Sequence, residues 1–215
     1  MLKIIEKNSL FFALYIISFF VVFFSELNKP ILETTLYFSA QRTALGDSFF
    51  SYWTLLGEAY PYFFVALFFY FHQKDKQKTL KTALTGLIIL VVTFLLKETF
   101  ESPRPAAVLE NLGLDRTFNY VAGIEMHTGA TSFPSGHTTS AFALWGLVAF
   151  QFSRFSSVQL GLFLTAFLVG LSRVYLAQHF VQDTLFGSAI GISVALGVEY
   201  YFSKKSTYNH QAPPQ

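Results

Sequence analysis

The sequence predicts an all-α integral membrane protein with six transmembrane helices in one bundle. Hydrophobic residues make up 53% of the 215-residue chain and charged residues only 13%, whereas soluble domains carry about 25% charged residues. A helix that crosses a bilayer needs about 20 mostly apolar residues. Six stretches approach that length, at 9–26, 50–71, 80–98, 138–153, 158–177 and 183–202.

Three of these spans have features of their own. The first follows Lys3 and Lys7 like a signal peptide, but no small-x-small cleavage site follows it, so we expect it to remain in the mature protein. The second is interrupted by Glu58 and Pro61, which predicts a kink. The fourth is the shortest, and we expect it to begin within the outer leaflet under the loop that precedes it.

The distribution of basic residues predicts the orientation. Six spans divide the Lys and Arg residues between two sides, and basic residues accumulate on the cytoplasmic side. One side holds nine, namely Lys3, Lys7, Lys74, Lys76, Lys78, Lys81, Arg154, Lys204 and Lys205. The other side holds six, of which three are assigned to chemistry below: Lys29, Arg42, Lys97, Arg104, Arg116 and Arg173. We therefore expect a protein of the inner (cytoplasmic) membrane with both termini in the cytoplasm.

The loops 27–49, 99–137 and 178–182 then face away from the cytoplasm. The loop 99–137, between the third and fourth helices, is longer than usual connections, so we expect it to be functional. Residues 1–203 are predicted to form a single domain and residues 204–215 a disordered cytoplasmic tail. The net charge is only +2 and the basic residues are scattered, which argues against a nucleic-acid partner. Oligomeric state stays open.

The first polar cluster lies at the outer end of the third span. Lys97 is followed after six residues by Arg104, which stands between Pro103 and Pro105. The prolines should end the helix and hold Arg104 in extended backbone, so that it returns beside Lys97. The alternative is a snorkelling lysine and an unrelated loop arginine.

The second cluster precedes the fourth span and reads Pro134, Ser135, Gly136, His137. A Ser-Gly pair at a helix N-terminus offers a hydroxyl and backbone N–H groups to an anion, and glycine allows close approach. The alternative is an ordinary helix start, since serine is a good N-cap residue.

The third cluster contains Arg173, His179 and Asp183. If the last helix starts near His179, the spacing of four puts His179 and Asp183 on one face. The carboxylate could then accept an N–H from one ring nitrogen and leave the lone pair on the other. Gly187 and Gly191 continue this face and predict close helix packing. The alternative is a pair that anchors the helix at the membrane interface.

Together these clusters resemble the signature of the type-2 phosphatidic acid phosphatase (PAP2) family, whose phosphatase core is shared with vanadium-dependent haloperoxidases. That signature is a lysine six residues before Arg-Pro, then Pro-Ser-Gly-His, then Ser-Arg, five residues, His, three residues and Asp. The chain matches it without departure at Lys97 to Arg104-Pro105, at 134–137, and at Ser172-Arg173 to His179 to Asp183. The resemblance implies a PAP2-type helical bundle.

The resemblance also implies roles for these residues. His179 would attack phosphorus and form a phosphohistidine, Asp183 would orient His179, and His137 would be the general acid and base. The remaining residues would bind the phosphate, namely Lys97, Arg104, Ser135, Gly136 and Arg173. No metal and no cofactor are expected, because these donors supply the charge stabilisation that phosphoryl transfer needs.

A site at the outer membrane boundary favours a lipid phosphate, whose tail stays in the bilayer. Undecaprenyl diphosphate, phosphatidylglycerophosphate, phosphatidate and lipid A stay open as substrates, as does a small soluble phosphoester. A lipid phosphotransferase using the same site is the main alternative function, and a transporter or a haloperoxidase is disfavoured. The roles of Glu58 and of the loop 106–133 are left open between a part in the site and a structural part.

Overall fold

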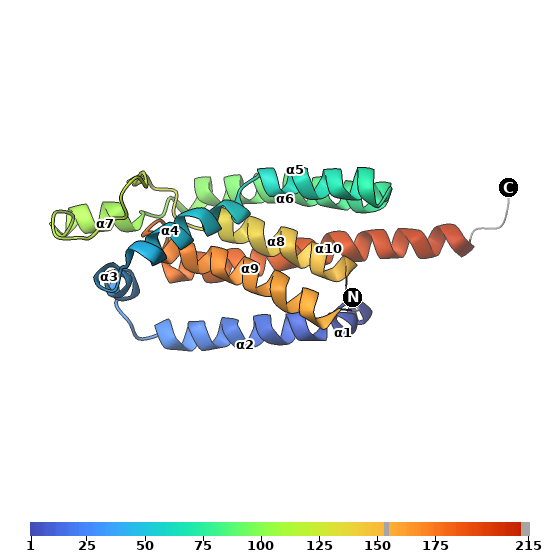
Figure 1. The fold of residues 1–215 in the computed structure, drawn as a ribbon, viewed down its shortest axis with the longest axis horizontal. Helices are drawn as coiled ribbons and strands as arrows, with labels where there is room; N and C mark the ends of the chain where they lie inside the picture. Colours follow the sequence, from blue (N-terminus) through green and yellow to red (C-terminus); the bar gives the residue numbers. More distant parts are fainter. Residues whose placement is uncertain (153–154, 212–215) are drawn as a thin grey trace.

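The computed structural model describes residues 1–152 and 155–211, with side chains up to Lys204. Over this part of the chain all regular elements are helical (Figure 1). They are α1 (Leu2–Lys7), α2 (Ser9–Glu26), α3 (Glu33–Ala40), α4 (Ala44–Trp53), the 3₁₀ turn η1 (Thr54–Gly57), α5 (Tyr60–Leu67), the π-helical turn η2 (Phe68–His72), α6 (Lys76–Phe100), α7 (Pro105–Asn111), α8 (Gly136–Gln151), α9 (Ser156–Tyr175) and α10 (Val181–Gln211).

The predicted disordered tail, 204–215, lies almost wholly beyond the described side chains. The backbone of this segment continues α10 as far as Gln211.

The centre of the bundle is α8, which packs against both α9 and α10. Ala143, Leu144 and Leu147 of α8 are completely buried. The close packing predicted for Gly187 and Gly191 is found: a Cβ atom at Gly191 would collide with the carbonyl oxygen of Thr139 in α8. Helix–helix contact in a membrane depends on such small residues, because lipid tails are as apolar as the side chains they replace.

Four segments in the described chain are long and apolar enough to cross a membrane: Ser9–Glu26, Lys76–Asn111, Ser156–Tyr175 and Val181–Lys204. A fifth is formed by Ala44–Gly57 and Tyr60–His72 if this bent pair counts as one span. The chain is therefore a multi-pass membrane protein. The remaining predicted span, the fourth at 138–153, corresponds to α8, which has only 16 residues, so the number six stays a prediction.

The kink predicted in the second span is present as a break. The two halves meet at 61°, with Glu58 between them and Pro61 in the first turn of α5. Proline lacks the N–H that would continue the helix. The carbonyl of Leu56 instead accepts a hydrogen bond of 3.0 Å from the indole of Trp145 in α8. The break is thus tied to the centre of the bundle.

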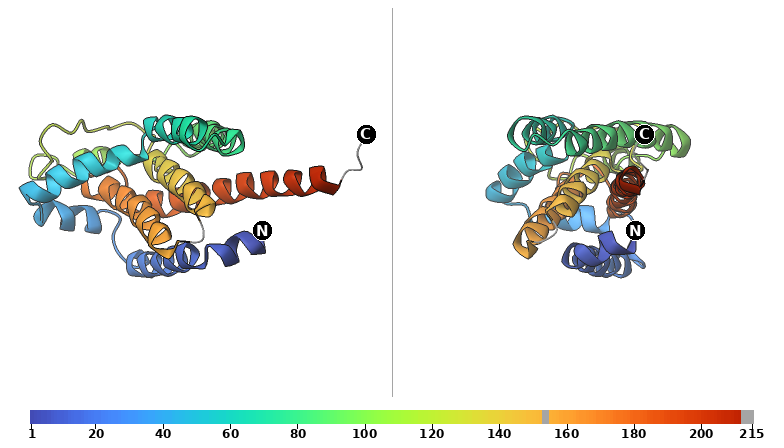
Figure 2. Two further views of the ribbon diagram at one scale, coloured as in Figure 1. Left: turned by 45° about the vertical axis from the view of Figure 1, so that its right-hand side comes forward. Right: turned by 90° about the vertical axis from the view of Figure 1, so that its right-hand side faces the viewer.

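Met1 and the last described turns of α10 lie toward one end of the bundle and the long connections at the other (Figures 1 and 2). Met1 lies beside the far part of α10, whereas α3 and α7 lie at the opposite end. These two short helices occupy segments that were expected to be loops. They have eight and seven residues, too few for a periodic pattern to identify in the sequence.

Candidate active site

Arg104 lies where three segments of the chain meet. The helix α6 ends at Phe100, and Arg104 is extended with φ −85° and ψ 160°, as the flanking prolines predicted. Its guanidinium donates hydrogen bonds to the hydroxyl and carbonyl of Thr131, at 3.3 and 3.4 Å, and to the carbonyl of Gln178 at 3.2 Å. The residue is only 7% exposed. It therefore connects the segment before the second cluster with the turn that carries the third.

The second cluster is fixed directly to the third. The N–H of Ser135 donates to the carbonyl of Asp183 at 3.1 Å, while the Ser135 hydroxyl caps α8 by accepting from the N–H of Thr138. The cap interpretation is therefore correct. Ser135 still belongs to the candidate site, because its N–H is hydrogen-bonded to Asp183.

Gly136, the first residue of α8, has open space beside it. A Cβ atom built there would meet no heavy atom within 4 Å. There is therefore room for an anion beside the first residue of α8.

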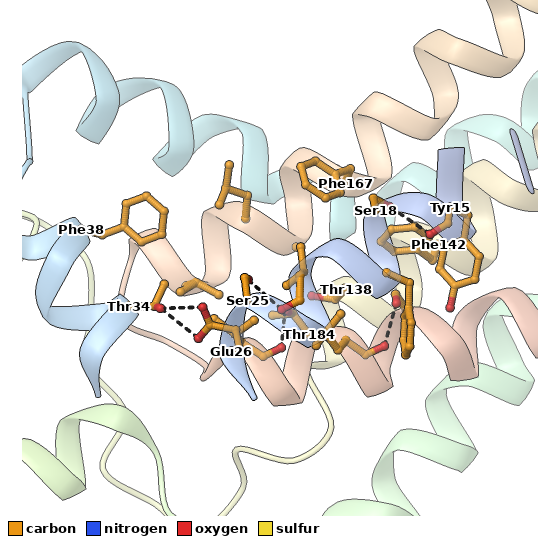
Figure 3. A pocket seen from close by; sticks show the side chains of 18 residues that line it. Tyr15, Ser18, Ser25, Glu26, Thr34, Phe38, Thr138, Phe142, Phe167 and Thr184 are labelled. Carbon is orange, nitrogen blue, oxygen red and sulfur yellow. Dashed lines mark hydrogen bonds between the residues drawn. The ribbon is translucent and has the colours of Figure 1, made fainter. Parts of the chain in front are cut away.

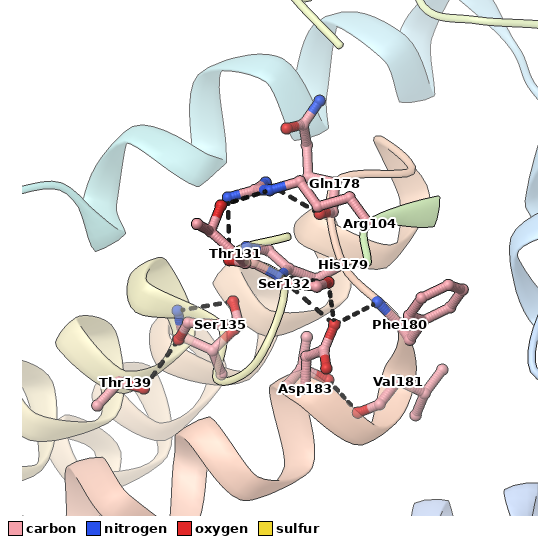
Figure 4. A network of polar contacts seen from close by, with 12 residues as sticks. Arg104, Thr131, Ser132, Ser135, Thr139, Gln178, His179, Phe180, Val181 and Asp183 are labelled. Atoms are coloured by element: carbon pink, nitrogen blue, oxygen red, sulfur yellow. Dashed lines mark hydrogen bonds and ion pairs between the residues drawn. The ribbon is translucent and has the colours of Figure 1, made fainter. Parts of the chain in front are cut away.

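The third cluster contains a buried histidine next to a carboxylate (Figure 4). His179 lies in the turn between α9 and α10 and is 2% exposed. Its Nδ1 atom is 3.6 Å from Oδ2 of Asp183 and 3.5 Å from Oγ of Ser132. The Asp183 carboxylate also accepts hydrogen bonds from the Ser132 hydroxyl and the Phe180 N–H. Nδ1 therefore faces the carboxylate side, which leaves Nε2 as the nitrogen for a ligand.

Three cations surround this histidine. The pKa of the His179 ring is held well below its ordinary value, first by burial and then by the charges of Arg173, Arg104 and Lys97. The ring is thus neutral at pH 7, with a lone pair available. Arg173 donates to the Thr54 hydroxyl at 2.8 Å, and its buried Nε has no partner in the described part of the chain.

The second histidine of the signature pairs with an acid from the broken span. Nε2 of His137 is 2.7 Å from Oε1 of Glu58. The two side chains are 24% and 43% exposed, so this pair lies at the accessible side of the site, unlike His179. The structure thus supports contact of Glu58 with a site residue, one of the two interpretations left open above.

Every predicted site residue therefore lies in this one region. The region comprises the C-terminal ends of α6 and α9 and the N-terminal ends of α7, α8 and α10. Ser172, part of the signature, faces elsewhere and donates to the Val169 carbonyl within its own helix. Sequence reasoning missed Ser132, Thr131 and Gln178. They support the site residues through side-chain or carbonyl contacts, and no spacing rule marks such residues in a sequence.

An apolar cavity of ≈ 200 Å³ lies between α2 and the pair α9 and α10 (Figure 3). It extends from Glu26 at one end to Tyr15 at the other, and Phe142 and Phe167 contribute to its wall. Thr138 also lines it, and the Thr138 hydroxyl is 2.9 Å from that of Ser135. One hydrogen bond therefore connects the cavity wall with the site.

The site as a whole suits a tetrahedral oxyanion. Lys97, Arg104 and Arg173 outnumber the carboxylates of Asp183 and Glu58, and the neutral ring of His179 lies among them. In the part of the chain that the structure describes, no group of three His, Cys, Asp or Glu side chains is arranged to hold a metal ion. Cations around a neutral imidazole match the requirements of phosphoryl transfer.

Comparisons with known proteins agree with this chemistry. The chain is 26% identical over 143 residues to undecaprenyl-diphosphatase BcrC of Bacillus subtilis, a match covering 66% of each protein. It is 35% identical over 89 residues to lipid A 1-phosphatase of Porphyromonas gingivalis, covering 39% of the chain and 20% of that protein. The matches thus span less than two thirds of the length of these relatives.

Two solved structures are similar to this protein over a larger part of the chain. The crystal structure of Aquifex aeolicus LpxE has a TM-score of 0.66 and 30% identity, covering 79% of this chain and 94% of LpxE. A PAP2-type phosphatidylglycerolphosphate phosphatase from Bacillus subtilis has a TM-score of 0.64 at 21% identity, covering 89% and 96%, and it supports the fold alone. Residues 79–207 match the PAP2 superfamily, and the chain belongs to this superfamily.

Proposed function

We propose that this protein is a metal-independent lipid phosphate phosphatase that works through a phosphohistidine on His179. The observation that carries the proposal is the placement of a buried, neutral His179 beside Asp183 and among Lys97, Arg104 and Arg173. The named activities of the relatives support the class, since each is a phosphatase or diphosphatase of a lipid.

In the first step, Nε2 of His179 attacks phosphorus, the N–P bond forms and the bond to the leaving oxygen breaks. Asp183 stabilises the positive charge that the ring gains. The three cations, the Ser135 hydroxyl and the Gly136 N–H bind the phosphoryl oxygens, whose charge must be stabilised in the transition state. His137 gives a proton to the departing oxygen.

In the second step, water attacks phosphorus, the N–P bond breaks and inorganic phosphate leaves. His137, now neutral, accepts the proton of that water, so one residue serves as acid and then as base. The ring of His179 returns to its neutral form. No step in this sequence needs a metal ion.

We infer a lipid substrate from the position of the site. The site lies at one end of a bundle whose outer surface is apolar, and the cavity beside Thr138 can accept a hydrocarbon chain. Met1 and the last described turns of α10 lie toward the opposite end. With six spans and both termini in the cytoplasm, the site would face away from the cytoplasm.

Phosphate release by His179→Ala tests the mechanism, with His127→Ala as the matched control. His127 is an exposed histidine of the long loop. We expect His179→Ala to lose all measurable turnover and His127→Ala to keep the wild-type rate.

Acid-labile labelling of the wild-type protein by a ³²P-labelled substrate should disappear in His179→Ala. Turnover by His179→Ala would disprove the nucleophile, and inactivation by a chelator would disprove the metal-free mechanism.

The substrate is decided by a panel on purified protein in detergent. Undecaprenyl diphosphate, phosphatidylglycerophosphate, phosphatidate and lipid A are compared by kcat/KM for phosphate release. A glycerol or sugar acceptor added to the same assay separates hydrolysis from transfer, because transfer would release less phosphate than alcohol.

A further inference from the structure

The broken span contacts both sides of the candidate active site. In Figures 1 and 2 the break between α4 and α5 lies beside the start of α8. Within this break, Thr54 accepts a hydrogen bond from Arg173 and Glu58 contacts His137. Gly57, between them, lies so close to α8 that an added Cβ atom would be 2.7 Å from the carbonyl oxygen of His137.

We propose that Glu58 is a positioning residue that orients His137 for proton transfer, so that the site contains a second histidine–carboxylate pair. This proposal rests on the proposed function. The first pair, His179 with Asp183, comes from one turn of chain, whereas the second joins α8 to a helix break far away in sequence.

The geometry assigns a nitrogen to each task. Nε2 of His137 is 2.7 Å from the Glu58 carboxylate, so Nδ1 is the ring nitrogen left for substrate. The protonated ring donates Nε2–H to Glu58 and Nδ1–H to the leaving oxygen. After that transfer Nδ1 carries a lone pair, and it can accept the proton of the attacking water in the second step. The carboxylate keeps its charge throughout and stabilises the imidazolium form.

The other charges near His137 make this partner necessary. Burial, together with the charges of Arg173 and Lys97, lowers the pKa of the His137 ring, and the hydrogen bond and charge of Glu58 oppose that shift. Without Glu58 the protonated form of the ring would be disfavoured further. The helix break places the Glu58 carboxylate beside His137, because the chain changes direction by 61° where Gly57 contacts the His137 backbone. A continuous helix would not change direction at this point.

The main test compares Glu58→Gln with the wild type on two substrates. Glutamine keeps the shape and removes the charge. On an alkyl lipid phosphate, kcat should fall at least about tenfold, as part of the roughly 10²–10⁴-fold contribution of a general acid or base, while KM changes less than about twofold. On p-nitrophenyl phosphate, whose leaving group needs little protonation, the initial burst of nitrophenolate should keep its rate and only the later steady state should slow.

Two further variants separate positioning from a structural effect. Glu199→Gln removes a carboxylate from a buried ion pair with Lys81 at 2.8 Å, away from the site, and should change stability without changing the ratio of burst to steady state. In a His137→Ala background, Glu58→Gln should have no additional effect, because the residue acts through the missing ring.

Three results would overturn the proposal: unchanged kcat on the lipid phosphate, an equal loss of burst and steady-state rates, or the same loss in the His137→Ala background. The proposed function is judged separately, because wild-type phosphate release and its dependence on His179 do not involve Glu58.

Discussion

Gly136 and the cations around His179 show how single residues prepare this site for an anion. Arg173 is almost fully buried, and its Nε–H has no partner among the described residues; a buried donor without a partner costs about 1–3 kcal/mol. A phosphoryl oxygen would satisfy it. At Gly136 the space beside the backbone is open. The unpaired Nε–H of Arg173 costs stability, and the space at Gly136 is left unfilled by the protein. A bound phosphate would explain both features.

Gly136→Ala should therefore reduce phosphate binding without harming the fold. The new methyl group has no protein atom within 4 Å, and alanine in a helix is about 0.5–1 kcal/mol better than glycine, so the melting temperature in detergent should stay equal or rise. We expect KM for the lipid phosphate and Ki for inorganic phosphate to increase roughly tenfold to 100-fold, the equivalent of one lost hydrogen bond to a charged group. An unchanged Ki would place the anion elsewhere.

At the scale of elements, α8 and α10 form the contact on which the site depends. The Ser135 N–H donates to the Asp183 carbonyl, so the start of α8 is held at the first turn of α10. Further along, Gly191 allows the two backbones to approach until a methyl group would collide with Thr139. The position of the phosphate donors relative to His179 thus depends on glycines outside the site.

Gly191→Ala should lower both stability and activity. The added methyl group must push α8 and α10 apart, and overpacking typically costs about 1–3 kcal/mol. Gly197→Ala is the matched control on the same helix, since its Cβ position has no neighbour within 4 Å. Thermal unfolding in detergent and kcat should decrease only for Gly191→Ala. Equal melting temperatures for the two variants would contradict the packing argument.

For the whole molecule, the exposed side chains are more apolar than a water-soluble protein would tolerate. Phe24, Phe64, Leu90 and Phe94 are each at least 60% exposed, and they lie on segments long enough to span a bilayer. Large exposed apolar surfaces mark contact with a membrane or partner. The charged side chains of Arg104, Arg173 and Asp183, in contrast, are buried in the candidate site. This arrangement supports the proposal that a charged site lies at a membrane boundary.

The orientation can be measured with single cysteines, because the chain contains no cysteine. Thr128→Cys lies in the long loop and Gln77→Cys near the start of α6, and both positions are exposed. With both termini in the cytoplasm, a membrane-impermeant maleimide should label Thr128→Cys in intact spheroplasts and Gln77→Cys only after lysis. The reverse pattern would put the site in the cytoplasm.

The sequence by itself determined the helical membrane class, the approximate limits of the long helices, the break near Pro61 and the extended Arg104 between its prolines. These features depend on local chemistry: apolar length, missing N–H groups and restricted backbone angles. The spacing of the three clusters also predicted which residues gather.

Only the tertiary structure decided how they gather. Ser132 lies beside both His179 and Asp183, Thr54 binds Arg173, and Glu58 meets His137 rather than a tyrosine near the kink. Each of these contacts joins segments distant in sequence, and the angle of a helix break determines which side chain reaches across. No local pattern encodes that angle, because it results from the packing of the broken span against α8 and α9.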